Sequence, residues 1–183
     1  MKNKANYFQI LSIFFIVSMI IAGCHRDSLT DKSIQISPKN GFATTYTFEN
    51  GVWTFPKVDD GIDKELHLTG TFPSQQEFYK LMVMVDFYED VQAESLPLVI
   101  TTTSPDGNSM QSTNVLMEFT DEETVTELGE ENAKKLQRVT KIIYPSKQFP
   151  DEGSYRFTVY SKYTKMSLNG IKSLTIAAQK VEK

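Results

Sequence analysis

Short runs of alternating apolar and polar residues, separated by turn signals, fill the chain from residue 41 onwards and constrain its fold more than any other feature. Leu66, Leu68 and Phe72 alternate with polar residues, which is typical of a strand with one buried face. Residues 81–85 are continuously apolar, which indicates a strand buried on both faces. Residues 105–108, Pro-Asp-Gly-Asn, have the composition of a tight turn.

Eight to ten such strands at regular spacing predict an all-β domain over residues 41–183, an antiparallel β-sandwich with a jelly-roll-like arrangement. An Asn-Gly pair at residues 50–51 predicts a further turn, before a strand that contains Trp53. Residues 121–136 are strongly acidic and break the pattern, and for them we expect a short helix or an exposed loop. The sequence contains no internal repeat and no linker to a second domain.

The N-terminal 23 residues have the pattern of an export signal. Lys2 and Lys4 precede a 12-residue run, from Ile10 to Ile21, that is apolar except for two serines. As a helix this run would be about 18 Å long, at ~1.5 Å per residue, whereas the bilayer core is ~30 Å thick. A basic start, a short apolar run and small residues before Cys24 predict a signal peptide over residues 1–23.

The tetrad Ile21-Ala22-Gly23-Cys24 resembles the bacterial lipobox. The resemblance implies cleavage before Cys24, a diacylglyceryl group on its sulfur and, usually, acylation of the new amine by a fatty acid such as palmitate. Several acyl chains anchor a protein stably, because each buried methylene contributes ~0.8 kcal/mol. Residues 24–40 are then the lipidated N-terminus and a polar tether. His25 is not the Asp that signals inner-membrane retention, so we expect the outer membrane. Residues 25–28 lack the acidic composition of a Bacteroidetes-type surface-export signal, so we expect the periplasmic side.

Charge and cysteine content restrict the partners and cofactors of the folded part. The chain has 19 Lys and Arg against 23 Asp and Glu, and loss of the two leader lysines lowers its net charge from −4 to −6. This balance argues against nucleic acid or an anionic lipid surface as the main partner. Cys24 is the one cysteine, and the two histidines are far apart, so we predict no zinc site and no cofactor.

The sequence supplies few residues for chemistry. His67 lies on the polar face of an expected strand, where a surface residue is the simpler interpretation. The acidic loop Asp59–Asp63 is a candidate for binding calcium, although its spacing is not that of an EF-hand and acidic turns are common. We find no phosphate-binding loop and no nucleophile elbow, and we therefore do not expect an enzyme.

Aromatic residues are the remaining candidates for binding. On a sheet face, aromatic rings could form a platform that stacks on a sugar, and the candidates are Tyr46, Trp53, Phe55, Tyr160 and Tyr163. Of these, Trp53, Tyr160 and Tyr163 are the ones that we single out as binding residues. The competing interpretation, favoured for Trp53 and Phe55, is that alternating aromatics belong to the sandwich core.

The order of several motifs resembles that of the GldH-type gliding-motility lipoproteins of Bacteroidetes. The motifs are Asn50-Gly51-Val52-Trp53, Phe87-Tyr88-Glu89-Asp90, Ser104-Pro105-Asp106-Gly107, Gly153-x-Tyr155-x-Phe157 and Leu168-Asn169-Gly170-Ile171. The resemblance covers residues 24–183. Two features depart from it: Asp86-Phe87 replaces an expected Arg-Asn pair, and the acidic run replaces a segment with Gly and Trp near residues 115–130.

The resemblance implies a non-catalytic outer-membrane component associated with the gliding or protein-export machinery. It supplies no catalytic residues. The expected partners are the membrane, through the lipid on Cys24, and another envelope protein. The alternative is a carbohydrate-binding surface lipoprotein that captures a glycan with exposed aromatic rings.

Overall fold

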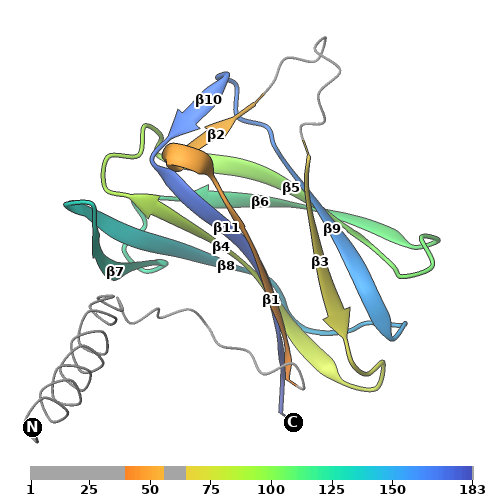
Figure 1. Ribbon diagram of the computed structural model, residues 1–183. Helices are drawn as coiled ribbons and strands as arrows, with labels where there is room; N and C mark the ends of the chain where they lie inside the picture. Colours follow the sequence, from red (N-terminus) through yellow and green to blue (C-terminus); the bar gives the residue numbers. More distant parts are fainter. Residues whose placement is uncertain (1–39, 56–64, 183) are drawn as a thin grey trace, which may run out of the picture. The chain divides into compact units, whose positions relative to one another are not determined.

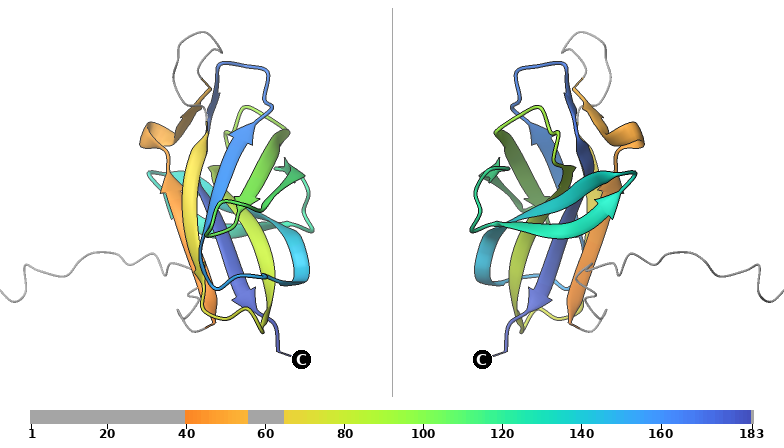
Figure 2. Two further views of the ribbon diagram at one scale, coloured as in Figure 1. Left: turned by 90° about the vertical axis from the view of Figure 1, so that its right-hand side faces the viewer. Right: turned by 90° about the vertical axis from the view of Figure 1, so that its left-hand side faces the viewer.

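A computed structural model of the chain describes residues 40–55 and 65–182, which are almost entirely antiparallel β-sheet (Figure 1). Two large sheets face each other, and a two-stranded sheet lies at one end (Figure 2). The five-stranded sheet contains, in spatial order, β1 (Gly41–Thr47), β11 (Ile171–Lys180), β4 (Phe78–Tyr88), β8 (Lys134–Gln148) and β7 (Val125–Glu131). The four-stranded sheet contains β3 (Leu66–Phe72), β9 (Gly153–Ser161), β5 (Ser95–Thr103) and β6 (Met110–Glu118). The small sheet pairs β2 (Val52–Thr54) with β10 (Ser167–Asn169), and the 3₁₀ turn η1 (Glu49–Gly51) precedes β2.

The order of the strands is that of a jelly roll. One sheet runs β1-β11-β4-β8, with β7 added at its edge, and the other runs β3-β9-β5-β6. The chain crosses from sheet to sheet at almost every connection, and the β5–β6 and β7–β8 hairpins are the exceptions. The predicted antiparallel β-sandwich with a jelly-roll arrangement is therefore confirmed.

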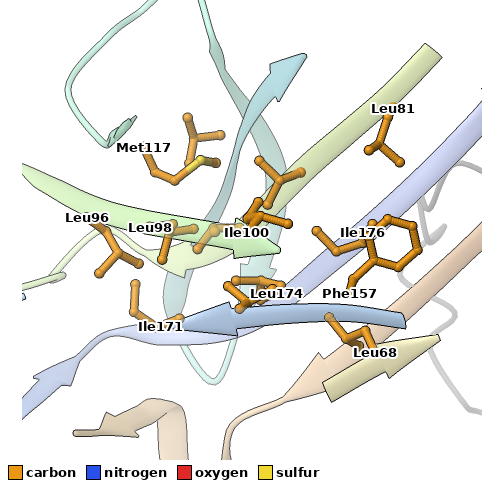
Figure 3. Close-up of a cluster of buried hydrophobic side chains, with 14 of the residues drawn as sticks. Leu68, Leu81, Leu96, Leu98, Ile100, Met117, Phe157, Ile171, Leu174 and Ile176 are labelled. Carbon is orange, nitrogen blue, oxygen red and sulfur yellow. The ribbon is translucent and has the colours of Figure 1, made fainter. Parts of the chain in front are cut away.

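The hydrophobic core fills the space between the two sheets (Figure 3). Alternation along each strand sends every second side chain inward, so Leu68, Gly70 and Phe72 of β3 are buried while the residues between them are exposed. Other side chains that are almost fully buried come from both sheets: Leu81, Leu96, Leu98, Ile100, Met117, Phe157, Ile171, Leu174 and Ile176.

Strand β4 is buried on both faces, as its continuous apolar run predicts. Leu81 and Val83 point into the core and have no exposed surface. Met82 and Met84 point to the opposite side of the sheet, where they form a small second cluster with Ala177 of β11. Their exposed fractions are only 4% and 2%, so the outer side of this central strand is also shielded from water.

An aromatic cluster closes one end of the core. The rings of Phe72 and Phe149 stack with their centroids 3.8 Å apart, and the ring of Tyr155 stands edge-on to both at 5.2 Å. The backbone N–H of Asp151 donates a hydrogen bond to the Tyr155 hydroxyl at 3.1 Å. Burial raises the pKa of this phenol. The turn before β9 is thus fixed by the tyrosine that follows it.

The helix or exposed loop expected at residues 121–136 is wrong. The segment forms β7 and the start of β8, joined by a two-residue turn between Glu131 and Lys134. Asn132 and Ala133 have φ of 51° and 60°, the left-handed conformation that a type I′ hairpin turn requires at both central residues. The sequence does not predict this turn, because alanine rarely adopts the left-handed conformation. The acidic side chains of β7 also make the alternation of apolar and polar residues along that strand difficult to recognise.

Candidate functional site

The elements η1, β2 and β10 lie together at one end of the sandwich (Figure 1), and an aromatic run passes through this region. Adjacent ring centroids are 5.0 Å apart for Tyr46 and Phe48, 4.8 Å for Phe48 and Trp53, 5.1 Å for Trp53 and Phe55, and 5.7 Å for Phe55 and Tyr163. The turn at residues 50–51 connects β1 to β2, and it thereby brings the aromatic residues before and after the turn next to each other. The run connects an exposed ring, Tyr46, to a partly exposed one, Tyr163.

Trp53 belongs to the core of this aromatic run. Only 3% of its surface is exposed, and its indole stacks on the ring of Phe48 with an interplanar angle of 25°. The indole therefore offers no free face to a sugar ring in this conformation. The core interpretation, which the alternating sequence favours, agrees with this position.

Tyr163 lies in the connection between β9 and β10. Its backbone N–H donates to the Ser161 hydroxyl at 3.0 Å, and its own hydroxyl donates to the carbonyl of Gln92 at 3.4 Å. Gln92 also accepts a hydrogen bond from the side-chain amide of Asn169 at 3.2 Å. Tyr163 thus has a partly buried ring, and its hydroxyl is hydrogen-bonded to the connection between β4 and β5.

Tyr160 faces away from the core on the outer side of the four-stranded sheet. It lies opposite Val99 of β5 and is half-buried, whereas its neighbour Val159 points inward and is fully buried. Val99 is only 6% exposed although it also points outward. The structure therefore separates Tyr160 from the buried Trp53, and the three candidate aromatics do not form one platform.

The outer side of the four-stranded sheet carries many hydroxyl groups. Thr101 of β5 and Ser112 of β6 form a hydrogen bond at 2.8 Å, and Thr71 and Ser154 form another at 2.9 Å. His67 is exposed on this face, with its Nδ1 3.4 Å from the Thr158 hydroxyl. This is the surface position that its place in the sequence pattern predicts.

Several of the described carboxylates are paired with basic side chains or bound in turns. Lys141 Nζ donates to Glu118 at 3.0 Å and to Asp121 at 3.4 Å. The Thr124 hydroxyl bonds to Asp121 at 2.9 Å and is the main cause that lowers the pKa of this carboxyl. Within residues 40–55 and 65–182, no three His, Cys, Asp or Glu side chains are grouped so that they could hold a metal ion.

Among the described residues, hollows on the surface of the sandwich include the following two. One, of about 420 Å³, lies beside the β3–β4 connection and the end of β8 and is lined by Gln75, Gln76, Gln148 and Pro150. The other, of about 360 Å³, lies beside β7 and is lined by Phe119, Thr120, Glu122, Val125, Glu127 and Gln137. Neither contains any of the aromatic candidates from the sequence.

The exposed edge of strand β6 is a feature that the sequence does not reveal. Met110 and Leu116 are 69% and 48% exposed, and no charged residue occurs between Met110 and Met117. Its pattern is too weakly alternating to identify an exposed face. Only the sheet order shows that β6 is an edge strand, whose hydrogen-bonded neighbour among the described residues is β5 alone.

Two sequence candidates lie outside the described residues, namely Cys24 and the proposed calcium loop Asp59–Asp63. Among the residues that the structure does describe, no helix is long and apolar enough to cross a membrane.

Comparisons with known proteins place the chain in no family. No protein-family model matches it, and no curated protein matches it. Among solved structures, the chain is similar to the Eiger TNF of S. frugiperda, with 11% identity over 79% of this chain and 94% of that one and a TM-score of 0.39.

Proposed function

We propose that this chain is an outer-membrane lipoprotein and a non-catalytic structural or interaction component of the cell envelope, held on the periplasmic side. Cys24 is the anchor, and the β-sandwich is the part that contacts an envelope protein. The function then comes from position: a lipid anchor confines a binding module near its partner and raises the effective concentration of a weak contact.

The observation that carries this proposal is the place of the single cysteine at the end of a lipobox, 17 residues before the first strand begins at Gly41. At roughly 3.3–3.6 Å per residue, that segment spans no more than about 60 Å. The sandwich would therefore stay close to the membrane surface, within reach of other envelope proteins.

The association with gliding motility or protein export rests on the ordered motifs shared with GldH-type lipoproteins. Three of these motifs have structural roles in this chain. Trp53 is a core residue, Tyr155 fixes a turn, and the amide of Gly170 donates to the carbonyl of Gly51 at 2.9 Å. These roles would be kept in any relative that shares the fold, so they support a common framework and identify no partner.

Membrane fractionation tests the proposal. The full-length chain and its Cys24→Ser variant would be expressed in a diderm bacterium, and the membranes separated by density. We expect the wild-type chain in the outer-membrane fraction and the variant outside it. Added protease should spare the wild-type chain in intact cells and digest it after the outer membrane is permeabilised. Identical distribution of the two chains would disprove anchoring through Cys24.

The second candidate function is carbohydrate binding, and Tyr160 is the observation that favours it. Its partly buried ring lies on a sheet face rich in hydroxyl groups, an arrangement in which a sugar could stack and form hydrogen bonds. A glycan array comparing the wild type with Tyr160→Ala would test this candidate. A glycan bound by the wild type and lost in the variant, with unchanged circular dichroism, would support it over a protein partner.

A further inference from the structure

The two large sheets end in four edge strands within the described residues: β1, β7, β3 and β6. β1 and β3 lie side by side, and the Thr44 hydroxyl of β1 donates to the Thr69 carbonyl of β3 at 2.5 Å. β7 carries Glu127, Glu130 and Glu131, so a second β7 beside it would bring like charges together. β6 is neutral from residue 110 to residue 117 and has no strand beyond it.

The backbone groups that β6 leaves without a strand partner can be identified from its pairing with β5. The N–H of Ser104 donates to Ser109 and the N–H of Phe119 donates to Glu94, both at 2.9 Å, at the two ends of this ladder. Hydrogen-bonded and non-hydrogen-bonded pairs alternate along antiparallel strands. The backbone groups that point away from β5 therefore belong to Met110, Ser112, Asn114 and Leu116.

The side chains of these four residues point to the outer face of the sheet and are all exposed. The intervening residues point inward, where the Thr113 hydroxyl is 2.9 Å from the Tyr144 hydroxyl of β8. The exposed side chains form the sequence apolar, polar, polar, apolar. This order is the same in both directions along the strand. Two antiparallel copies of β6 can therefore place apolar side chains opposite apolar ones and polar side chains opposite polar ones.

We propose that two copies of this chain pair through β6, antiparallel and centred on Thr113. In this register Met110 lies opposite Leu116 of the second copy, and Ser112 lies opposite Asn114 of the second copy. The two largest exposed apolar side chains of β6 then cover each other, and the polar side chains Ser112 and Asn114 face each other. Neither β6 strand contributes a charge to these pairs, and the Lys162 ammonium, which donates to the Asn114 side chain at 3.0 Å, lies beside the polar pair. The free backbone groups of both edges become paired, and the two four-stranded sheets become one continuous sheet.

This pairing goes beyond the proposed function and does not require a lipid on Cys24. Confinement of both copies to one membrane would favour it, because a small contact gains from a high local concentration.

A disulfide at the centre of the proposed pair is the first test. Thr113 would lie opposite Thr113 of the second copy, in a non-hydrogen-bonded pair whose Cα atoms are ~4.5 Å apart, within the range that a disulfide spans. The full chain with Thr113→Cys, expressed in a bacterial envelope and oxidised with diamide, should give a disulfide-linked homodimer. Thr126→Cys, exposed on β7, should not. Both variants are also made with Cys24→Ser, which removes the only other thiol.

The second test introduces charges at the proposed interface and measures the mass of the protein in solution. Leu116→Lys places the lysines opposite Met110, so sedimentation velocity of the detergent-solubilised chain should show a monomer where the wild type is a dimer. Adding Met110→Glu to this variant puts a carboxylate opposite each lysine and should restore the dimer. Ile142→Lys, at a 55% exposed position on the other sheet, should leave the dimer intact.

The results that overturn the proposal are equally defined. A wild-type chain that stays monomeric at every concentration reached, with no linked homodimer from Thr113→Cys, would disprove self-pairing. A Thr113→Cys chain linked only to a different envelope protein would also disprove it, and would show that β6 accepts a foreign strand. Circular dichroism of Leu116→Lys must match the wild type, which its exposed position predicts.

Discussion

Arg138 of β8 donates two hydrogen bonds to the carboxylate of Asp86 on the neighbouring strand β4, with Nε–Oδ1 and Nη2–Oδ2 distances of 2.6 Å and 2.9 Å. The Ser173 hydroxyl of β11 donates to the same carboxylate at 3.0 Å. Asp86 is only 8% exposed, so three adjacent strands are joined by one largely buried, fully bonded group. Such a network fixes the register of the strands, because a shift by one residue would leave a charge unpaired.

We predict that Arg138→Ala destabilises the fold by about 3 kcal/mol, because it leaves the Asp86 carboxylate largely buried without its partner. Lys134→Ala is the matched control. It removes a 2.6 Å salt bridge to Asp90 in which both side chains are about half exposed, and such solvent-screened pairs contribute little to stability. Urea unfolding measures both free energies. Equal losses in the two variants would contradict the structural importance of the buried pair.

Gly170 is a glycine at which we expect an added side chain to be costly. Its φ is +90°, and a Cβ built there would lie 2.6 Å from the Cα of Val91, which is backbone and cannot move aside. Gly107 also has a positive φ, +77°, but its Cβ would meet nothing within 4 Å. Gly107→Ala should therefore cost only the backbone strain of about 1–2 kcal/mol, and Gly170→Ala clearly more. Thermal unfolding of the two variants compares them directly, and a smaller loss at residue 170 would be the contradicting result.

Trp53 and Tyr160 should respond differently to truncation. Trp53→Ala opens a cavity in the aromatic run, and buried Trp→Ala substitutions cost about 3–5 kcal/mol. Tyr160→Ala removes a partly buried ring from an outer sheet face and should cost about 1 kcal/mol or less. Denaturant midpoints measured at equal protein concentration distinguish the two. A folded, nearly undestabilised Trp53→Ala protein would show that this indole is not part of the core.

The β5–β6 turn should make a small contribution to stability that disappears in acid. The Ser104 hydroxyl and, next, the amide of Asn108 bond to the Asp106 carboxylate and hold its pKa below the usual 3.8. A folded-state pKa below the unfolded value adds stability above pH ~4, which is lost as the pH falls through the folded pKa. The stability difference between the wild type and Asp106→Asn should therefore shrink below pH 4. A difference that stays constant between pH 7 and pH 3 would contradict this role.

Most of the fold follows from side-chain periodicity. β3 and β4 are predicted because alternation and continuous apolarity report directly which faces are buried, and residues 105–108 are predicted because turn chemistry is local. The β7–β8 hairpin is missed because its turn depends on Ala133 in a left-handed conformation, which tertiary structure imposes. Pairing partners are non-local, so no pattern in the chain could indicate that Asp86 and Arg138 would meet.

The candidate sites were harder to predict than the fold. An aromatic residue on a strand gives the same pattern whether it faces the core or a ligand, and only packing places Trp53 inside and Tyr160 outside. The exposed edge of β6 is set by the order of strands in the sheet, which its neutral and weakly alternating sequence does not report. Cys24 differs in kind, because it is proposed from a linear motif that needs no fold to be recognised, and lipidation at this residue stays a prediction.

Incorporation of labelled palmitate tests the lipid anchor most directly. The full-length wild-type chain, expressed in a bacterial envelope and immunoprecipitated under denaturing conditions, should carry the label, and Cys24→Ser should carry none. Label that persists in Cys24→Ser, or a wild-type chain recovered unlabelled and free in solution, would contradict a β-sandwich whose work depends on its attachment to the membrane.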